Sequence, residues 1–377
     1  RLFVASSNDN VSLSSKRGRD APTYLPSYLR DARNVEIYHP TLRPNGALQL
    51  SVAENYMMED LLVPAFSSAR QTSSFSSDLI YYQPTQGRED LRRVLCDSYL
   101  PFLLHLEGNG STSSLNPNNL VVGAGCNAVL ENICLCLAEF GEGIMIPTPY
   151  YAAFEFDLTC RIGLKIIPVH PYPSLKGSPT RTTPSLDDYY PTFASLENAY
   201  ALAKDSGIVP RILLLSHPNN PLGIIYPKSV LQEILAWCQS RDMHVISDEI
   251  YAGSVFPPTA AAKSSSYEGT EFTSMLHLVT PAMKDQVHWI YALSKDFCLS
   301  GLRVGLCYTQ NEEILYPLQK LNDLCQVSSI TQSILVKLLN TSSTSFPVKF
   351  LAEARNRLRG RSQPSCFGRV VKFHVLQ

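Results

Sequence analysis

The sequence lacks the features that would place it on a nucleic acid or in a membrane. Its 377 residues carry a formal net charge of −1 and only 17% of them are charged, so no surplus of positive charge is present to bind a phosphate backbone or an anionic lipid surface. The longest apolar runs are shorter than the roughly 20 residues that a membrane-spanning helix needs. The N-terminus contains no apolar signal-peptide core and no initiator methionine, which is the pattern of a fragment. We therefore expect neither nucleic acid nor a membrane among its partners.

Paired cysteine spacing is also absent. The ten cysteines are scattered along the chain, and Cys134 and Cys136 lie in an apolar stretch, as small core residues do. Without pairs at metal-ligand spacing we expect no metal site. Unpaired cysteines favour a reducing compartment, and we expect a cytoplasmic protein.

What is present is the composition of a globular chain with a large core. With 45% hydrophobic residues, the chain is long enough for two domains. Apolar strands alternate with helices, which is typical of an α/β fold with a mainly parallel sheet covered by helices on both faces. Strands are expected at 47–50, from 120 onward, and at 143–147, 163–169, 211–216, 243–247 and 287–293, and helices at 88–100, after 127 and at 229–240.

A glycine turn, Gly123-Ala-Gly125, separates the strand that begins at Leu120 from the helix that follows it. The start of a helix presents free backbone N–H groups that can bind an anion, although many strand-to-helix turns contain glycine and bind none. The spacing of apolar residues in this helix predicts four that face the core: Val129, Ile133, Leu137 and Phe140.

Lys295 and Arg303 form the most informative pair in the sequence. The apolar run 287–293 brings Lys295 to the end of a strand, and a lysine in apolar surroundings can lose its proton and act as a nucleophile. Arg303 is a permanent cation suited to a phosphate. A nucleophilic amine beside a phosphate-binding cation suggests a Schiff base with pyridoxal phosphate. By itself, however, Lys295 is also compatible with an ordinary lysine at a strand end.

Other polar residues follow apolar strands. Asp248 comes directly after the strand 243–247, where a buried carboxylate costs free energy unless a cation pairs with it. Asn220 lies in a loop stiffened by two prolines and can present its amide. In a parallel sheet the strand ends share one edge, where such folds bind their ligands. The groups expected to meet there are Gly125, Cys126, Asn127, Tyr151, Asn220, Asp248, Tyr251, Lys295 and Arg303.

Five motifs in order give the chain a family resemblance. They are Ala-Glu-Asn at 53–55, Pro-Thr-Pro-Tyr-Tyr at 147–151, His-Pro-Asn-Asn-Pro-Leu-Gly at 217–223, Ser-Asp-Glu-Ile-Tyr at 247–251 and Ser-Lys-Asp-Phe-Cys-Leu-Ser-Gly-Leu-Arg-Val-Gly at 294–305. The chain resembles fold-type I pyridoxal-phosphate enzymes of the class I/II aminotransferase superfamily, and within them 1-aminocyclopropane-1-carboxylate (ACC) synthases and ACC synthase-like proteins. The resemblance runs from about residue 38 to about residue 359.

The resemblance implies a three-layer α/β/α large domain with a mainly parallel sheet, and a smaller second domain. It places an N-terminal arm and part of the small domain at 1–55 and the large cofactor-binding domain at 56–320. A connecting helix and an incomplete small domain with an atypical tail occupy 321–377. Family members of this kind also imply a homodimer.

The resemblance also implies roles for the residues that match the motifs. Lys295 matches the lysine that forms the internal aldimine and later carries the Cα proton. Asp248 matches the aspartate that pairs with the protonated pyridine nitrogen, which makes the ring a better electron sink. Asn220 and Tyr251 match the groups that hydrogen-bond the ring hydroxylate. Lys295, Asp248 and Tyr251 are therefore the expected catalytic residues.

Further matches surround that centre. Tyr151, or alternatively Tyr150, matches the aromatic residue that stacks on the ring. Tyr82 matches a tyrosine that reaches across the dimer interface, and Glu54 and Tyr24 lie where ACC synthases contact substrate. The residues that match the phosphate cup are Gly125, Cys126, Asn127, Ser294 and Arg303.

The implied reaction starts at the Cα of an amino acid and passes through a quinonoid stabilised by the ring. ACC formation and transamination both proceed from that carbanion, and so does carbon–sulfur bond cleavage, as in lyases of fungal secondary metabolism. A different alternative is a truncated, non-catalytic homologue that still binds the cofactor. The expected partner in each catalytic case is a small-molecule amino-acid substrate.

The sequence departs from the family pattern in several places. Ala292 stands where a phosphate-binding serine is usual, and His217 stands in the first place of an Asn-Pro-x-Asn-Pro loop. Thr85 takes the place of a motif tyrosine, which Tyr82 replaces in a shifted register. After residue 359 the tail matches nothing in the family, and its late arginine, Arg369, has no motif of a carboxylate clamp. We expect a truncated end and a weakened substrate site.

Overall fold

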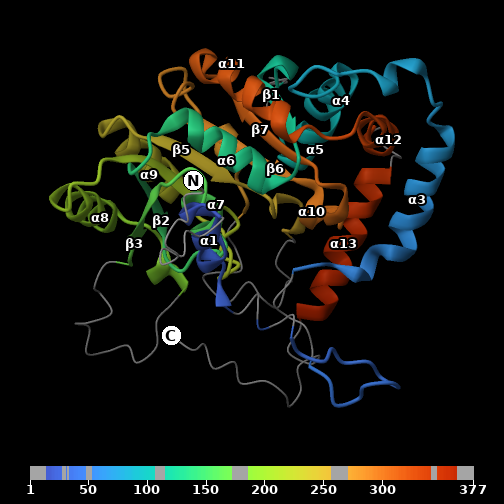
Figure 1. Ribbon diagram of the computed structural model, residues 1–377, viewed down its shortest axis with the longest axis horizontal. Coiled ribbons are helices and arrows are strands. Elements are labelled where there is room, and N and C mark those ends of the chain that lie inside the picture. Colours follow the sequence, from blue (N-terminus) through green and yellow to red (C-terminus); the bar gives the residue numbers. More distant parts are fainter. Residues whose placement is uncertain are drawn as a thin grey trace, which may run out of the picture.

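A computed structural model of the protein describes residues 14–27, 31, 34–47, 53–106, 115–171, 186–255, 271–340 and 346–362. A seven-stranded sheet lies at its centre (Figure 1). The strands are β1 (Leu120–Gly123), β2 (Gly143–Pro147), β3 (Lys165–Val169), β4 (Pro210–Ser216), β5 (His244–Asp248), β6 (Val287–Ala292) and β7 (Gly305–Thr309). They lie side by side in the order β1-β7-β6-β5-β4-β2-β3, and only β7 runs antiparallel to its neighbours. The expected mainly parallel sheet is confirmed.

Helices cover both faces of this sheet, which gives the three layers. Because strand side chains alternate between faces, successive residues of one strand enter different cores. Ile212 and Leu214 of β4 pack in one core with α6 (Cys126–Leu137), α7 (Phe154–Thr159) and α11 (Glu312–Leu321). Leu213 and Leu215 pack in the opposite core with α8 (Phe193–Asp205) and α9 (Lys228–Ser240).

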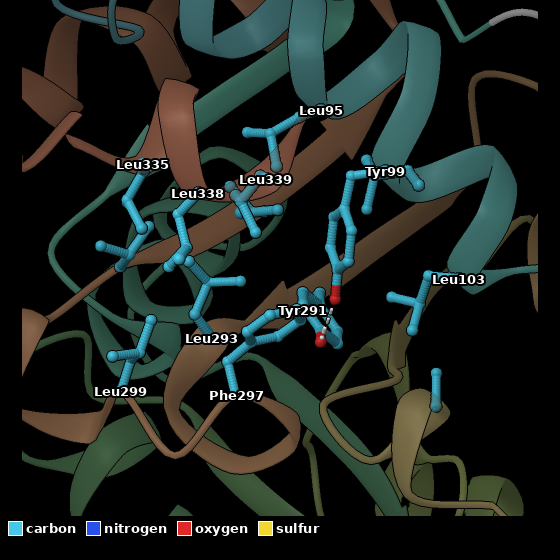
Figure 2. Close-up of a cluster of buried hydrophobic side chains, with 14 of the residues drawn as sticks. Leu95, Tyr99, Leu103, Tyr291, Leu293, Phe297, Leu299, Leu335, Leu338 and Leu339 are labelled. Atoms are coloured by element: carbon cyan, nitrogen blue, oxygen red, sulfur yellow. Dashed lines mark hydrogen bonds between the residues drawn. The ribbon is translucent and has the colours of Figure 1, made fainter. Parts of the chain in front are cut away.

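A third core lies where β1, β6 and β7 meet the remaining helices on the right of Figure 1. These helices are α3 (Glu59–Thr72), α4 (Glu89–Val94), α5 (Leu100–Leu103), α12 (Ser329–Leu339) and α13 (Phe346–Ser362). A π-helical turn, Leu95–Tyr99, joins α4 to α5. Figure 2 shows Tyr99 of this turn pointing toward Tyr291 of β6, while Leu95 lies beside Leu339 of α12 in the same core. This packing supports the strand that leads to Lys295.

Short elements complete the described chain. They are α1 (Lys16–Asp20), η1 (Ala21–Tyr24), η2 (Tyr56–Met58), η3 (Ser77–Ile80), η5 (Pro117–Asn119), η7 (Leu186–Tyr189), η8 (Ala252–Ser254), η10 (Met275–His277), α10 (Leu293–Asp296), η11 (Ser300–Leu302) and η12 (Asn322–Cys325). In the part of the chain that the structure describes, no helix has the length and apolar character needed to span a membrane. The same residues contain no cluster of side chains that could hold a metal ion.

One helix face differs from the prediction. Val129, Ile133 and Leu137 of α6 are buried as expected, but Phe140 is 82% exposed. The helix ends at Leu137 because Ala138 has extended backbone angles, and Phe140 therefore leaves the helical face. Residues 48–50 of the strand expected at 47–50 lie outside the described residues, and Ala47 forms an isolated bridge with Ile37.

Candidate active site

The strand register brings the candidate residues to one edge of the sheet. Asp248 ends β5 opposite Ser216 of β4 and Ile290 of β6. Ala292, the last residue of β6, pairs with Gly305, the first residue of β7. Gly305 also pairs with Gly123, the last residue of β1. The ends of β1, β4, β5 and β6 and the start of β7 therefore lie together, and the loops that follow them or precede β7 hold the expected groups.

Lys295 lies in α10, directly after β6 and at this edge. Its Nζ donates a hydrogen bond to the backbone carbonyl of Ala53, 2.9 Å away. Burial lowers the pKa of the Lys295 amine, while the nearby Glu54 carboxylate opposes that shift. Because loss of solvation disfavours the ammonium form, the amine is closer to its nucleophilic state than an exposed lysine would be.

Asp248 is a buried carboxyl beside that amine. Burial raises the pKa of Asp248 to about 7, and the positive charge of Lys295 opposes this rise only weakly. Its Oδ1 accepts the backbone N–H of Ile250 at 3.2 Å and lies 4.0 Å from the sulfur of Cys126. Among the described residues it joins no ion pair. A buried carboxyl in this state offers an acceptor to a cationic group of a ligand.

Gly125 and Arg303 form a cradle at the start of α6. Gly125 has a φ of 98°, and a Cβ built on it would lie 2.2 Å from Nη2 of Arg303. Only glycine lets the guanidinium approach this closely. Arg303 itself has left-handed backbone angles and donates from Nη1 to the carbonyl of Ser300 at 2.9 Å. No ion pair within the described residues engages its charge.

The first residues of α6 extend this cradle. A helix leaves its first backbone N–H groups without helical acceptors, and Cys126 and Asn127 occupy these positions. The Asn127 side chain is already engaged, since its amide donates to both oxygens of Asp157 at 3.0 Å. The cradle therefore offers the backbone of Asn127 rather than its side chain. Burial, acting against the Asn127 bond, raises the pKa of Asp157 to about 6.

Tyr151, Asn220 and Tyr251 follow the ends of β2, β4 and β5 at the same edge of the sheet. Burial raises the pKa of Tyr251, with contributions from the charges of Asp248 and Tyr151, so the three groups lie near one another. The Tyr151 ring is partly exposed and stands edge-on to Phe154. The backbone N–H of Asn220 donates to Ser216 Oγ at 3.3 Å, and its side-chain amide has no hydrogen-bond partner among the described residues.

Comparison with known proteins decides the family. The profile of the aminotransferase class I and II family matches residues 46–364. The chain belongs to this family.

Among curated members of the aminotransferase family, the chain is similar to ACC synthase 7 of Arabidopsis thaliana, with 31% identity over 96% of this chain and 77% of that protein. It is 33% identical to ACC synthase 6 of Oryza sativa subsp. japonica over 85% of this chain, but spans only 57% of that protein. A probable aminotransferase of Arabidopsis thaliana is 32% identical over 90% of this chain and 65% of its own length.

Solved structures show the same fold. Aspartate aminotransferase of Thermotoga maritima matches with a TM-score of 0.63 at 17% identity, over 92% of this chain and 79% of that chain. Tyrosine aminotransferase of Leishmania infantum matches with a TM-score of 0.64 at 17% identity, over 94% of this chain and 82% of that chain. The expected fold-type I architecture is confirmed.

Aminotransferases of this family use pyridoxal phosphate, and the residues at the sheet edge fit that group. Asp248 is a buried carboxyl that joins no ion pair among the described residues, and it can therefore accept the charge of a protonated ring nitrogen. Arg303 approaches Gly125 through space that a Cβ would fill. Ser294, almost fully buried in α10, lies next to Lys295 at the same edge.

The residues expected at the substrate differ in where they lie. Glu54 is within reach of the site: it accepts hydrogen bonds from Tyr56 at 2.5 Å and from Ser300 at 2.9 Å, which lower its pKa. Tyr24 belongs to the segment 22–27, which lines a hollow with Ala152 and Glu155. Tyr82 is fully exposed and does not reach the centre of its own chain.

The departures from the family pattern also have structural counterparts. Ala292 is completely buried and offers no polar atom to a phosphate. His217 is buried between the rings of Tyr226 and Phe272. Thr85 accepts a hydrogen bond through its carbonyl from Asn322, at 2.5 Å. Arg369 lies outside the described residues.

Sequence reasoning missed three groups that the structure places at the site. They are the Ala53 carbonyl, which accepts from Lys295, the Asp157 carboxyl, which accepts from Asn127, and Asp296, which follows Lys295 in the chain. Asp296 had a signal, because a charged residue directly after a buried strand needs partners. The other two contacts join residues distant in sequence, and no local pattern marks them.

Proposed function

We propose that this protein is a pyridoxal-phosphate enzyme that acts at the Cα of an amino acid, with ACC synthase-like or aminotransferase chemistry. One observation supports this most: the buried Asp248, which joins no ion pair among the described residues, lies at the same sheet edge as Lys295, an amine with a lowered pKa. Such a pair suits a cofactor that has a cationic ring nitrogen and an aldehyde. The names of the curated relatives support the choice of amino-acid substrate.

The residues would divide the work as follows. Bound pyridoxal phosphate supplies an electron sink for the carbanion at Cα. The Lys295 Nζ would hold the cofactor at its aldehyde carbon and would accept the proton from the substrate Cα. The Asp248 carboxylate would keep the ring nitrogen protonated. Tyr251 and Asn220 would donate to the ring hydroxylate, which would lower the proton affinity of that oxygen.

The remaining residues would bind and orient. Arg303 and the N–H groups at the start of α6 would hold the phosphate, with Gly125 and Ser294 beside them. Tyr151 would stack on the ring. Glu54 and Tyr24 would contact the substrate.

At the scale of the chain, we propose a cytoplasmic homodimer with Tyr82 at the interface. A large domain at 56–320 would bind the cofactor, with 1–55 and 321–377 contributing to a smaller one. The exposed position of Tyr82 agrees with this assignment.

The covalent link can be tested directly. The protein is incubated with pyridoxal phosphate, reduced with borohydride and digested, and the peptides are analysed by mass spectrometry. We expect the reduced cofactor on the Lys295 peptide in the wild type and in Lys320→Ala, an exposed lysine on α11, and no label in Lys295→Ala. A wild-type protein without visible absorption or label after loading would refute cofactor binding.

The reaction can be separated by product. Loaded protein is given S-adenosylmethionine, alanine or a cysteine conjugate, and the mixture is analysed for ACC, a keto acid or a released thiol. We expect ACC or a keto acid. A spectrum that responds to none of these amino acids would contradict the catalytic proposal while leaving cofactor binding intact.

A further inference from the structure

The residue that follows Lys295 is a buried carboxyl with three donors. Asp296 is 3% exposed. Its Oδ2 accepts the backbone N–H of Gly253 at 2.6 Å and the Tyr291 hydroxyl at 3.0 Å, and its Oδ1 accepts the Ser254 hydroxyl at 2.6 Å. A buried carboxylate is held in place when several donors share its charge.

Two of these donors belong to η8, the turn that follows Tyr251. The backbone N–H of Ser254 donates to the carbonyl of Tyr251 at 3.0 Å, so Tyr251 and Ser254 close one turn. Asp296 therefore fastens that turn to α10, which holds Lys295. The contact is tight, because a Cβ built on Gly253 would lie 2.6 Å from Asp296 Oδ2.

Residues of neighbouring elements also hold the Asp296 carboxyl and its partners in place. The Tyr291 hydroxyl, which donates to Asp296, is itself 2.8 Å from the Tyr99 hydroxyl, and the dashed line in Figure 2 marks this bond. From α13, Arg355 donates through Nε to the carbonyl of Gly253 at 2.8 Å, and its charge also acts on Asp296. Asp296 thus joins β6, η8 and α13 at one point.

We propose that Asp296 is a positioning residue that sets the place of the Tyr251 hydroxyl relative to Lys295. This inference rests on the proposed function, in which Tyr251 donates to the ring hydroxylate. Asp296 would act through Tyr251 and touch neither cofactor nor substrate. The two segments that it joins lie 43 residues apart in sequence, and the Gly253 N–H bond is a direct link between them.

The visible absorption of the loaded protein reports the Tyr251 contact without any turnover. A hydrogen-bond donor to the ring hydroxylate stabilises the negative charge on that oxygen. Loss of the donor therefore raises the pKa of the bound cofactor, and the absorption band of its protonated form persists to higher pH. The absorption is titrated in the wild type, Tyr251→Phe, Asp296→Asn and the double variant. We expect Asp296→Asn to move the midpoint upward by about one unit, in the direction of Tyr251→Phe. The double variant should move no further than Tyr251→Phe alone.

Two more variants separate position from stability. Ser254→Ala removes only the Oδ1 donor and should give a smaller upward shift, which keeps the test open if Asp296→Asn does not fold. Gln332→Ala removes a buried polar side chain on α12, bonded to the Arg88 N–H and the Val327 carbonyl, and should leave the midpoint unchanged.

The outcomes distinguish failure of the Asp296 positioning role from failure of the proposed cofactor-dependent function. An unchanged midpoint in folded Asp296→Asn, shifts that add in the double variant, or an equal shift in Gln332→Ala would each overturn the positioning role alone. A wild type with no visible absorption after loading would overturn the proposed function and this inference together.

Discussion

At the scale of single residues, the anion-binding cradle requires that residue 125 has no side chain. A methyl group there would displace the Arg303 guanidinium, since its Cβ would lie 2.2 Å from Nη2. We expect Gly125→Ala to weaken binding of pyridoxal phosphate about tenfold or more, equivalent to about 1.4 kcal/mol. Affinity is measured by absorbance titration.

Gly141 provides the matched control. It also has a positive φ, 90°, but a Cβ there would meet nothing within 4 Å. Gly141→Ala therefore shares the backbone strain without the collision. Equal affinities for the two alanine variants would show that the close approach of Arg303 to Gly125 has no part in binding.

His217 is the second residue whose behaviour follows from its surroundings. It is completely buried, accepts the Tyr226 N–H through Nδ1 at 3.4 Å, and lies with Nε2 3.1 Å from the Thr273 carbonyl. Burial lowers the pKa of His217 to about 4. The unfolded chain therefore binds a proton at higher pH than the folded protein does, and folding loses stability as pH falls from about 6.5 to about 4.

The His217 contribution is measured as a difference. The free energy of unfolding is determined by urea titration for the wild type and His217→Asn across that range. We expect the wild type to lose up to about 3 kcal/mol relative to the variant between pH 6.5 and 4. A constant difference between the two proteins would contradict a neutral buried imidazole.

At the scale of elements, α12 is joined to the start of α4 through one side chain. Gln332 is 1% exposed, accepts the Arg88 N–H through Oε1 at 2.8 Å, and donates through Nε2 to the Val327 carbonyl at 2.8 Å. Gln332→Ala leaves both backbone groups unsatisfied, and we expect it to lower the free energy of unfolding by about 2 kcal/mol or more in urea titration.

An exposed residue of the same helix is the comparison for Gln332. Lys337→Ala on α12 should change the free energy of unfolding by no more than about 0.5 kcal/mol. If both variants lost the same small amount, the Gln332 hydrogen bonds would not be what holds α12 to α4.

The elements themselves followed largely from sequence. The apolar runs 143–147, 211–216 and 243–247 became β2, β4 and β5 with shifts of one residue at most. The predicted burial of Phe140 was wrong, because the apolar spacing continues past Ala138, where the backbone leaves the helix. Periodicity reports which side chains are apolar and does not report where hydrogen bonding stops.

At the scale of the whole molecule, an exposed apolar segment marks the proposed dimer interface. Phe75, Ile80, Tyr81 and Tyr82 are all exposed on the segment around η3. Such clustering on one segment is typical of a surface that a partner covers. We expect Tyr82→Arg to weaken homodimerisation tenfold or more, measured as about that change in the dissociation constant by sedimentation.

Tyr316→Arg is the control, since Tyr316 is an equally aromatic, exposed residue on α11. It should dimerise as the wild type does. A monomeric wild type at all concentrations, or equal weakening by both variants, would exclude the proposed interface.

The sequence by itself determined the chemistry that is available and the order in which it appears. It contained the lysine after a buried strand, the carboxyl after another, and the glycine turn with its distant arginine, because strands, turns and motifs are local patterns. Only the tertiary structure decided which of these groups meet. Lys295 binds the Ala53 carbonyl, Asn127 is engaged by Asp157, and Asp296 joins the Tyr251 turn. Each of these contacts closes a separation of 30 residues or more, which packing sets and local spacing does not.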